Sequence, residues 1–284
     1  MAASKRPTWR ARWLGRKLRQ LRENKELAVK DVAEYLGVRQ PTLNRYENGL
    51  FPVKAQDLET LLDLYGVDDI DDRVQLLRLA QSANQRGWWE GYVNSEFSDY
   101  LWAESQAARM RVFTLDTWPG LIQAPEFAKA LISEGPQSHD PEKSTLLFKA
   151  RVMRGEVLRK ADAAEASFLI HEAILDQRDA GPAVIAAQLR YALELAERPN
   201  VSLRILPAAS WAHVRAGLGS GFRVLEMREA WPTLMQVDTP IGAVVAEGED
   251  VESFADAYDA LWNEHSLGEE GSIDRIKAVL KDVE

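Results

Sequence analysis

The chain has 284 residues, of which 46% are hydrophobic, with nine tryptophans, no cysteine and a formal net charge of −9. This composition predicts folded cores rather than disorder, and the length allows two domains. The missing cysteines exclude disulfides and thiolate metal sites. No stretch reaches the ~20 apolar residues of a membrane helix, so we expect a cytoplasmic protein with no membrane partner.

Charge is divided unevenly along the chain. Residues 1–66 hold thirteen Lys and Arg against eight Asp and Glu, a net charge of +5, whereas the remaining residues hold twenty-two against thirty-six, a net charge of −14. Residues 1–22 hold eight Lys and Arg and no acid. The division predicts that contact with a polyanion is confined to the first module. For Lys5 and Arg6 alone, a solvated tail is the better interpretation. Only beside a helix-turn-helix does contact of the run 1–22 with a DNA backbone or minor groove fit as well.

The segment Val29 to Gly49, VKDVAEYLGVRQPTLNRYENG, predicts two short helices joined by a tight turn. Ala33 is small where the two helices would cross, which allows a close approach. Gly37 stands at the turn, where we expect a positive φ and no room for a Cβ. Both helices supply the apolar contacts expected to hold them together: Val32, Ala33, Leu36, Val38, Leu43 and Tyr46.

The second of these helices leaves residue types that suit base edges and phosphates. The predicted DNA-binding residues are Arg39, Gln40, Pro41, Thr42, Asn44, Arg45 and Asn48. Gln40 begins the helix, and its amide can bridge adenine N6 and N7, while Pro41 suits a first turn because no N–H is needed there. An ordinary amphipathic hairpin shares the apolar spacing, but it does not require Ala33, Gly37 and the ending at residues 47–49 together.

This segment resembles the Cro/repressor-type (XRE family) helix-turn-helix, with Glu47-Asn48-Gly49 matching the end of the recognition helix. The resemblance implies double-stranded DNA as partner, a homodimer, and a five-helix domain. The five helices are expected over residues 13–23, 28–36, 40–48, 54–64 and 69–86. The chain departs from the family at Ala28 and Val29, where a Ser or Thr cap followed by Gln is common. Such a cap is worth about 1 kcal/mol, and one phosphate contact is lost with it.

Gly87-Trp88-Trp89-Glu90-Gly91 breaks the helical pattern, which predicts a DNA-binding domain over residues 1–90 and a second domain over residues 91–284. The second domain mixes helical and strand patterns, so the fold class is a mainly α five-helix domain followed by an α+β domain. Helices are expected over 99–111, 124–132, 143–160, 181–197, 249–264 and 273–281. Strands are expected over 111–115, 167–174, 201–207, 221–227, 234–238 and 242–247.

Trp118-Pro119-Gly120-Leu121-Ile122-Gln123-Ala124-Pro125-Glu126-Phe127-Ala128 resembles a "PGLLQTPEYA" segment of actinobacterial regulators, of which the WhiJ-like developmental regulators are examples. The match continues through Gly181-Pro182-Ala183-Val184, Pro199-Asn200-Val201, Arg204-Ile205-Leu206-Pro207 and Gly221-Phe222. In that family the domain follows a repressor-type helix-turn-helix. The resemblance implies a transcriptional regulator whose second domain senses a small-molecule effector or binds a small protein partner encoded nearby. The alternative is an antitoxin-like protein that neutralises a small neighbour and represses its own operon.

No catalytic or metal site stands out in the sequence. His171 and Glu172 with Asp176 form the closest cluster, but on a strand over 167–174 neighbouring side chains point to opposite faces. The glycine-rich run 217–221 matches neither a phosphate loop nor a dinucleotide motif, because no Lys follows it and no helix begins there. We therefore expect no enzyme, no cofactor and no metal.

Overall fold

The structure, a computed structural model, describes residues 7–84, 95–135, 138–177, 179–210, 219–228, 231–239 and 242–284. The chain divides into two compact units. The first comprises Met1–Glu90, Asn94–Asp99 and Glu229–Trp231, and the second comprises Gly91–Val93, Tyr100–Arg228 and Pro232–Glu284. Lys5, Arg6, the expected border at 87–91 and the glycine at 217 lie outside the described residues.

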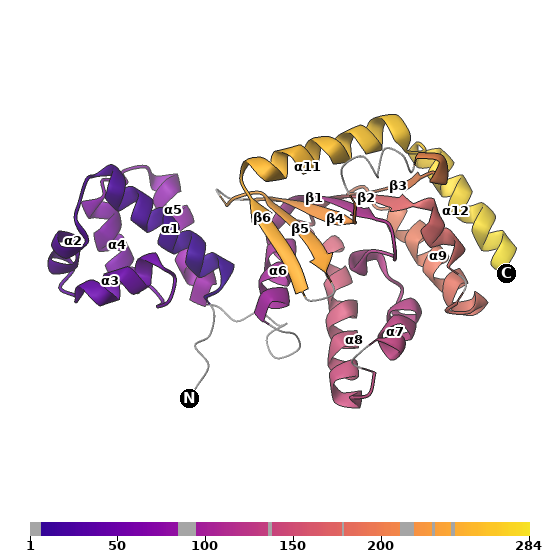
Figure 1. Ribbon diagram of the computed structural model, residues 1–284, viewed down its shortest axis with the longest axis horizontal. Coiled ribbons are helices and arrows are strands. Elements are labelled where there is room, and N and C mark those ends of the chain that lie inside the picture. The colour runs from indigo at the N-terminus through magenta and orange to yellow at the C-terminus, as the bar shows by residue number, and fades with distance from the viewer. Residues whose placement is uncertain are drawn as a thin grey trace. The chain divides into compact units, whose positions relative to one another are not determined.

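Between residues 7 and 84 the first unit is built from five helices (Figure 1). They are α1 (Trp9–Asn24), α2 (Val29–Tyr35), α3 (Gln40–Glu47), α4 (Ala55–Leu64) and α5 (Ile70–Asn84). Helix α1 begins one turn earlier than expected, because Thr8 caps it by accepting the N–H of Ala11 at 3.2 Å. The buried Trp9 then belongs to the helix. The expected five-helix arrangement is confirmed.

Glycine ends three of these helices in the same way. Gly37, Gly49 and Gly66 follow α2, α3 and α4 with φ of 69°, 67° and 65°. In each case the next N–H donates to the carbonyl five residues earlier, at 2.9, 2.8 and 3.0 Å, which satisfies the end of the helix. The expectation that Gly37 has no room for a Cβ is wrong, since nothing lies within 4 Å of that position. A Cβ on Gly49, in contrast, would stand 2.6 Å from the backbone of Ala11.

The second unit is built around a six-stranded sheet in the order β3-β2-β1-β4-β5-β6. The strands are β1 (Ala107–Thr114), β2 (Glu165–His171), β3 (Val201–Leu206), β4 (Phe222–Met227), β5 (Leu234–Thr239) and β6 (Gly242–Glu247). Strands β1, β2 and β3 are parallel neighbours because helical connections separate them, whereas β1 and β4, β4 and β5, and β5 and β6 are antiparallel. The expected α+β class is confirmed.

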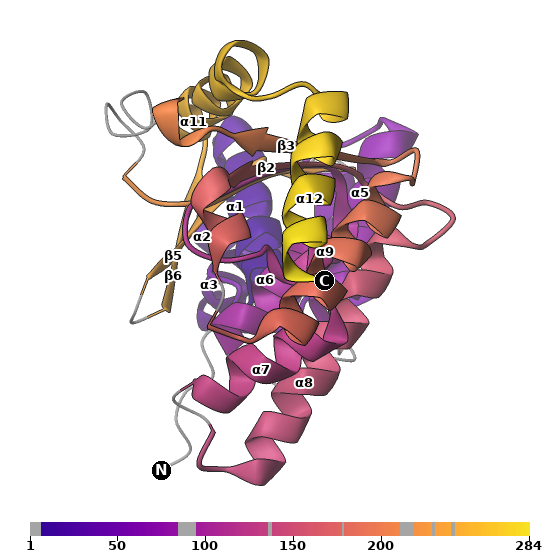
Figure 2. The same cartoon turned by 90° about the vertical axis from the view of Figure 1, so that its right-hand side faces the viewer.

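Helices cover both faces of this sheet (Figure 2). They are α7 (Pro125–Glu134), α8 (Pro141–Gly155), α9 (Pro182–Ala196), α11 (Glu249–Ala260) and α12 (Glu269–Val283). Helix α6 (Ser95–Gln106) precedes β1, and it belongs to this unit from Tyr100 onward. Helix α11 covers one face over a core that includes Phe113, Phe222 and Val224, and α7, α8 and α9 lie on the opposite face. Helix α12 protects the edge strand β3, because Ser272 Oγ accepts the N–H of Ile205 at 2.9 Å.

Several boundaries in the second unit differ from the sequence-based expectations: α6 begins at Ser95 instead of residue 99, and α12 begins at Glu269 instead of residue 273. Residues 107–111 are strand rather than helix, because Met110 is fully buried while Arg111 points to the α11 face, an alternation that tertiary packing imposes. The strand expected over 167–174 ends at His171, whose Nδ1 accepts the N–H of Ala173 at 3.2 Å and opens a 3₁₀ turn. Helix α8 ends at Gly155, before the expected residue 160. Among the described residues, none of the helices is long and apolar enough to cross a membrane.

Candidate nucleic-acid interface

A buried ion pair fixes α3, the second helix of the segment Val29 to Gly49, to α1. Arg22 Nε and Nη2 donate to the two carboxylate oxygens of Glu47 at 2.6 and 3.0 Å, and the two side chains are only 9% and 5% exposed. Arg22 Nη1 also donates to the carbonyl of Leu27 at 2.9 Å. The hydrogen bond to Glu47 raises the pKa of Arg22, although burial opposes the rise. Sequence reasoning missed this pair: it treated Glu47 as part of a motif and Arg22 as part of a basic run.

Close backbone contacts and one further hydrogen bond complete the support of α3. A Cβ on Gly15 would lie 2.5 Å from the carbonyl oxygen of Glu47, so α1 and the end of α3 approach without side chains between them. Tyr46 donates its hydroxyl to Asp57 at 2.7 Å, which ties α3 to α4. Burial and this hydrogen bond raise the pKa of Tyr46 to about 12. The supported side of α3 is therefore held on two helices.

The other side of α3 is polar and open to solvent. At about 100° per residue, Gln40, Asn44 and Asn48 together with Pro41 and Arg45 fall within an arc of roughly 140°. The structure brings all seven predicted residues together on α3 or at its ends, six of them exposed and Thr42 partly buried: Arg39, Gln40, Pro41, Thr42, Asn44, Arg45 and Asn48. The buried residues of α3 are Leu43, Tyr46 and Glu47.

The exposed side chains differ in how free they are. Asn48 donates its Nδ2 to the carbonyl of Asn44 at 2.6 Å and so helps to end α3. The guanidinium of Arg45 lies 5.4 Å from the ring centroid of Phe51, which directs it along the loop after the helix. No described residue forms a hydrogen bond or ion pair with the side chain of Gln40. At the start of α2, Ala28 makes no side-chain cap, as expected from the sequence.

The basic run at residues 1–22 is partly used inside the fold. Arg10 is 3% exposed and donates to the carbonyl of Ser82 at 2.7 Å, and Arg22 forms the buried ion pair with Glu47. From Trp9 onward the run is helix α1 rather than a tail. Four cations of the run remain exposed on α1: Arg12, Arg16, Lys17 and Arg19. The positive charge that this run leaves at the surface is therefore smaller than the sequence count suggests.

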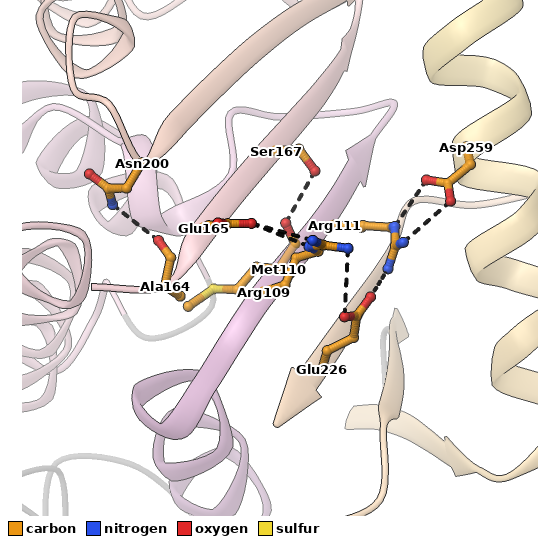
Figure 3. Close-up of polar contacts among 9 residues, drawn as sticks. All are labelled: Arg109, Met110, Arg111, Ala164, Glu165, Ser167, Asn200, Glu226 and Asp259. Atoms are coloured by element: carbon orange, nitrogen blue, oxygen red, sulfur yellow. Dashed lines mark hydrogen bonds and ion pairs between the residues drawn. The ribbon is translucent and has the colours of Figure 1, made fainter. Parts of the chain in front are cut away.

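The second unit has a polar cavity of about 470 Å³ on the α11 face, beside the beginnings of β1 and β2. Figure 3 shows that its arginines already have carboxylate partners. Arg111 donates to both oxygens of Asp259 at 3.0 and 3.3 Å and to Glu226, and Arg109 reaches Glu165 at 3.4 Å. Burial opposes the charge on Arg111, but these carboxylates more than offset it and raise its pKa. Neither arginine of the cavity lacks a counter-charge.

The side chains of His171 and Glu172, the cluster considered from the sequence, make contacts that stabilise the fold. The Glu172 carboxylate accepts the N–H of Ala208 at 3.0 Å and pairs with Arg275 at 2.7 Å. The backbone hydrogen bond, followed by Arg275, lowers the pKa of Glu172, and burial lowers that of His171. In the part of the chain that the structure describes, no three His, Asp or Glu side chains are grouped so that they could hold a metal ion.

Comparison with known families assigns both units. A protein-family model described as a helix-turn-helix domain matches residues 13–76 of the sequence. The model described as a domain of unknown function (DUF5753) matches residues 97–278, which is 182 of the 284 residues. No curated protein and no solved structure matches the chain. The first unit thus has the fold and the family assignment of a DNA-binding regulator.

Proposed function

Because the chain belongs to the family defined by the domain of unknown function DUF5753 and also carries a helix-turn-helix domain, we propose that it is a sequence-specific transcriptional regulator of the Cro/repressor type (XRE family). It binds double-stranded DNA as a homodimer. The observation that carries the proposal is the polar, exposed side of α3, opposite a side locked to α1 and α4. A rigid helix with free polar groups on one side is what major-groove reading requires.

Within this proposal the residues of α3 divide into two roles. Gln40 and Asn44, one turn apart on the exposed side, read base edges, because side-chain amides match the donor and acceptor pattern of adenine. Arg39 precedes the helix and Arg45 leans toward Phe51, so both are placed to bind flanking phosphates. Thr42, Pro41 and Asn48 complete the contact surface.

We assign sensing or partner binding to the second domain, over residues 91–284. Residues 67–284 carry a net charge of −14, which opposes contact with DNA and leaves DNA binding to the first domain, residues 1–90. A dimer places two copies of α3 about 34–36 Å apart, so the operator contains two half-sites one helical turn apart.

The direct test is binding of the full chain to DNA from its own promoter region and to a scrambled duplex of the same length. We expect a preference of at least ~10³-fold for the operator, with two chains bound per duplex. Equal affinity for the two duplexes contradicts the proposal. Isolation of the chain in a fixed ratio with a small protein encoded nearby, with loss of that protein's toxicity, favours the antitoxin-like alternative instead.

A further inference from the structure

Three arginines gather in the second unit on the face of the sheet opposite the cavity described above. Arg151 and Arg154 lie one turn apart on α8, and Arg223 lies on β4. Because its neighbours Phe222 and Val224 point into the core under α11, Arg223 points to the other face, where α8 lies. The guanidiniums of Arg154 and Arg223 both lie near one tyrosine ring, at 5.1 and 5.8 Å from its centroid.

Two of these arginines have direct carboxylate partners. Arg154 donates from Nε and Nη2 to the two oxygens of Glu104, each at 2.6 Å, and the side chains are 4% and 0% exposed. Its Nη2 also reaches the hydroxyl of Tyr100 at 3.0 Å. Arg223 donates from Nη1 to Asp238 at 2.6 Å. Burial opposes the charge on Arg154 and Arg223, but their partners more than offset it and raise both pKa values.

Arg151 has no such partner. No hydrogen bond or ion pair joins its side chain to any described residue. Its Nη1 and that of Arg154 lie 2.4 and 2.5 Å from the position that a Cβ on Gly120 would take, so the two nitrogens are at most 4.9 Å apart. Burial, followed by repulsion from Arg154 and Arg223, lowers the pKa of Arg151 to about 10. At pH 7 the group therefore remains a cation, and it is partly exposed to solvent.

Among the described residues the cluster has three cations and two carboxylates, and Asp238 is 63% exposed, so water screens its charge. A cation that is partly removed from water and has no direct carboxylate partner is unfavourable, and the planar guanidinium matches carboxylate and phosphate groups. We propose that Arg151, beside the paired Arg154, binds an oxyanion, the carboxylate or phosphate group of a small effector. Gly120 makes the site possible, since any side chain there would displace both guanidiniums. The inference rests on the proposed function, in which this domain senses a ligand.

Thermal unfolding of the full chain tests the site with inorganic phosphate and, in a second arm, succinate, each up to about 20 mM and against sodium chloride of equal ionic strength. At a concentration tenfold above Kd, the wild-type second unit should melt about 3–6 °C higher. Lys149→Gln removes an exposed cation from the same helix and should keep the shift. Arg151→Gln should lose the shift and, without anion, melt no lower than Lys149→Gln. A response to phosphate assigns a phosphate group, and a response to succinate assigns a carboxylate.

No shift of the wild type with either anion, or a shift that persists in Arg151→Gln, overturns the site. If Arg151→Gln does not fold, Arg151→Lys replaces it in the test: it keeps the charge but lacks the guanidinium fork, and should bind several-fold more weakly. A Lys variant with the wild-type response is also contrary to the proposal. DNA binding is measured separately, so an anion response without any change in DNA affinity leaves the site in place and removes only its sensing role.

Discussion

Replacing Glu47 by alanine would leave the Arg22 guanidinium buried without its carboxylate. The two side chains are 5% and 9% exposed and joined by two hydrogen bonds at 2.6 and 3.0 Å. Removing one partner of such a buried pair costs about 3–5 kcal/mol, mostly because the remaining charge stays desolvated. For a unit of this size that is a fall in Tm of at least ~12 °C. The pair Arg19–Glu23, joined by one hydrogen bond at 2.8 Å, is the control, because both of its side chains are more than half exposed.

Amide hydrogen exchange measured on peptides of α1 and α3 separates the first unit from the second. In Glu47→Ala, exchange of the most protected amides should accelerate by more than ~10²-fold, whereas Glu23→Ala should leave it almost unchanged. The double replacement Arg22→Met with Glu47→Leu removes both charges and should recover much of the loss. If Glu47→Ala lowers the free energy of unfolding by less than ~1 kcal/mol, or if the double variant is no more stable than Glu47→Ala, the role given to this pair is refuted.

Three other predictions follow from the two units. Gly49→Ala should lower the free energy of unfolding of the first unit in urea by ~3 kcal/mol or more, because the new Cβ would meet backbone at 2.6 Å. Gly37→Ala, with a similar φ but open space around it, should lower it by only ~1–2 kcal/mol. Equal effects of the two variants on the free energy of unfolding would contradict the close contact at Gly49. Burial lowers the pKa of His171 in the folded chain, so below about pH 6.5 the unfolded chain binds a proton that the folded chain does not. The free energy of unfolding should therefore fall as the pH is lowered through this range, and His171→Asn should make that fall less steep. A fragment of residues 1–90 should bind DNA more weakly than the full chain, and DNA binding by residues 91–284 would overturn the division of labour.

Local sequence patterns were sufficient to predict the helices of the first unit and the exposed polar side of α3. The apolar spacing around Leu43, the glycines at residues 37 and 49 and the polar side of α3 all lie within one short segment, and each has a local physical cause. The partner of Glu47 could not be predicted, because Arg22 lies 25 residues earlier and carries the same charge as the exposed cations around it. Only a folded arrangement separates a structural arginine from a binding one.

For the second unit the sequence predicted the α+β class, but it predicted the ends of several helices and strands less well and did not predict the arginine cluster. Residues 107–110 have helical composition, and only pairing with β2 and β4 makes them strand. Arg151 looked like one of several cations on a helix, and its lack of a counter-charge depends on Arg154, Arg223 and Gly120, which three separate segments bring together. Charge balance in a cluster of this kind is a property of the tertiary structure alone.

The central claim, that the exposed side of α3 reads DNA, is tested most directly by selecting bound duplexes from a random library with three forms of the full chain. Gln40→Ala should lose discrimination at one base pair in each half-site, worth ~1–3 kcal/mol, while the remaining positions of the preferred site stay unchanged. Gln20→Ala, the same replacement at an exposed position of α1, should select the wild-type site. Identical preferred sites for the wild type and Gln40→Ala would contradict the claim.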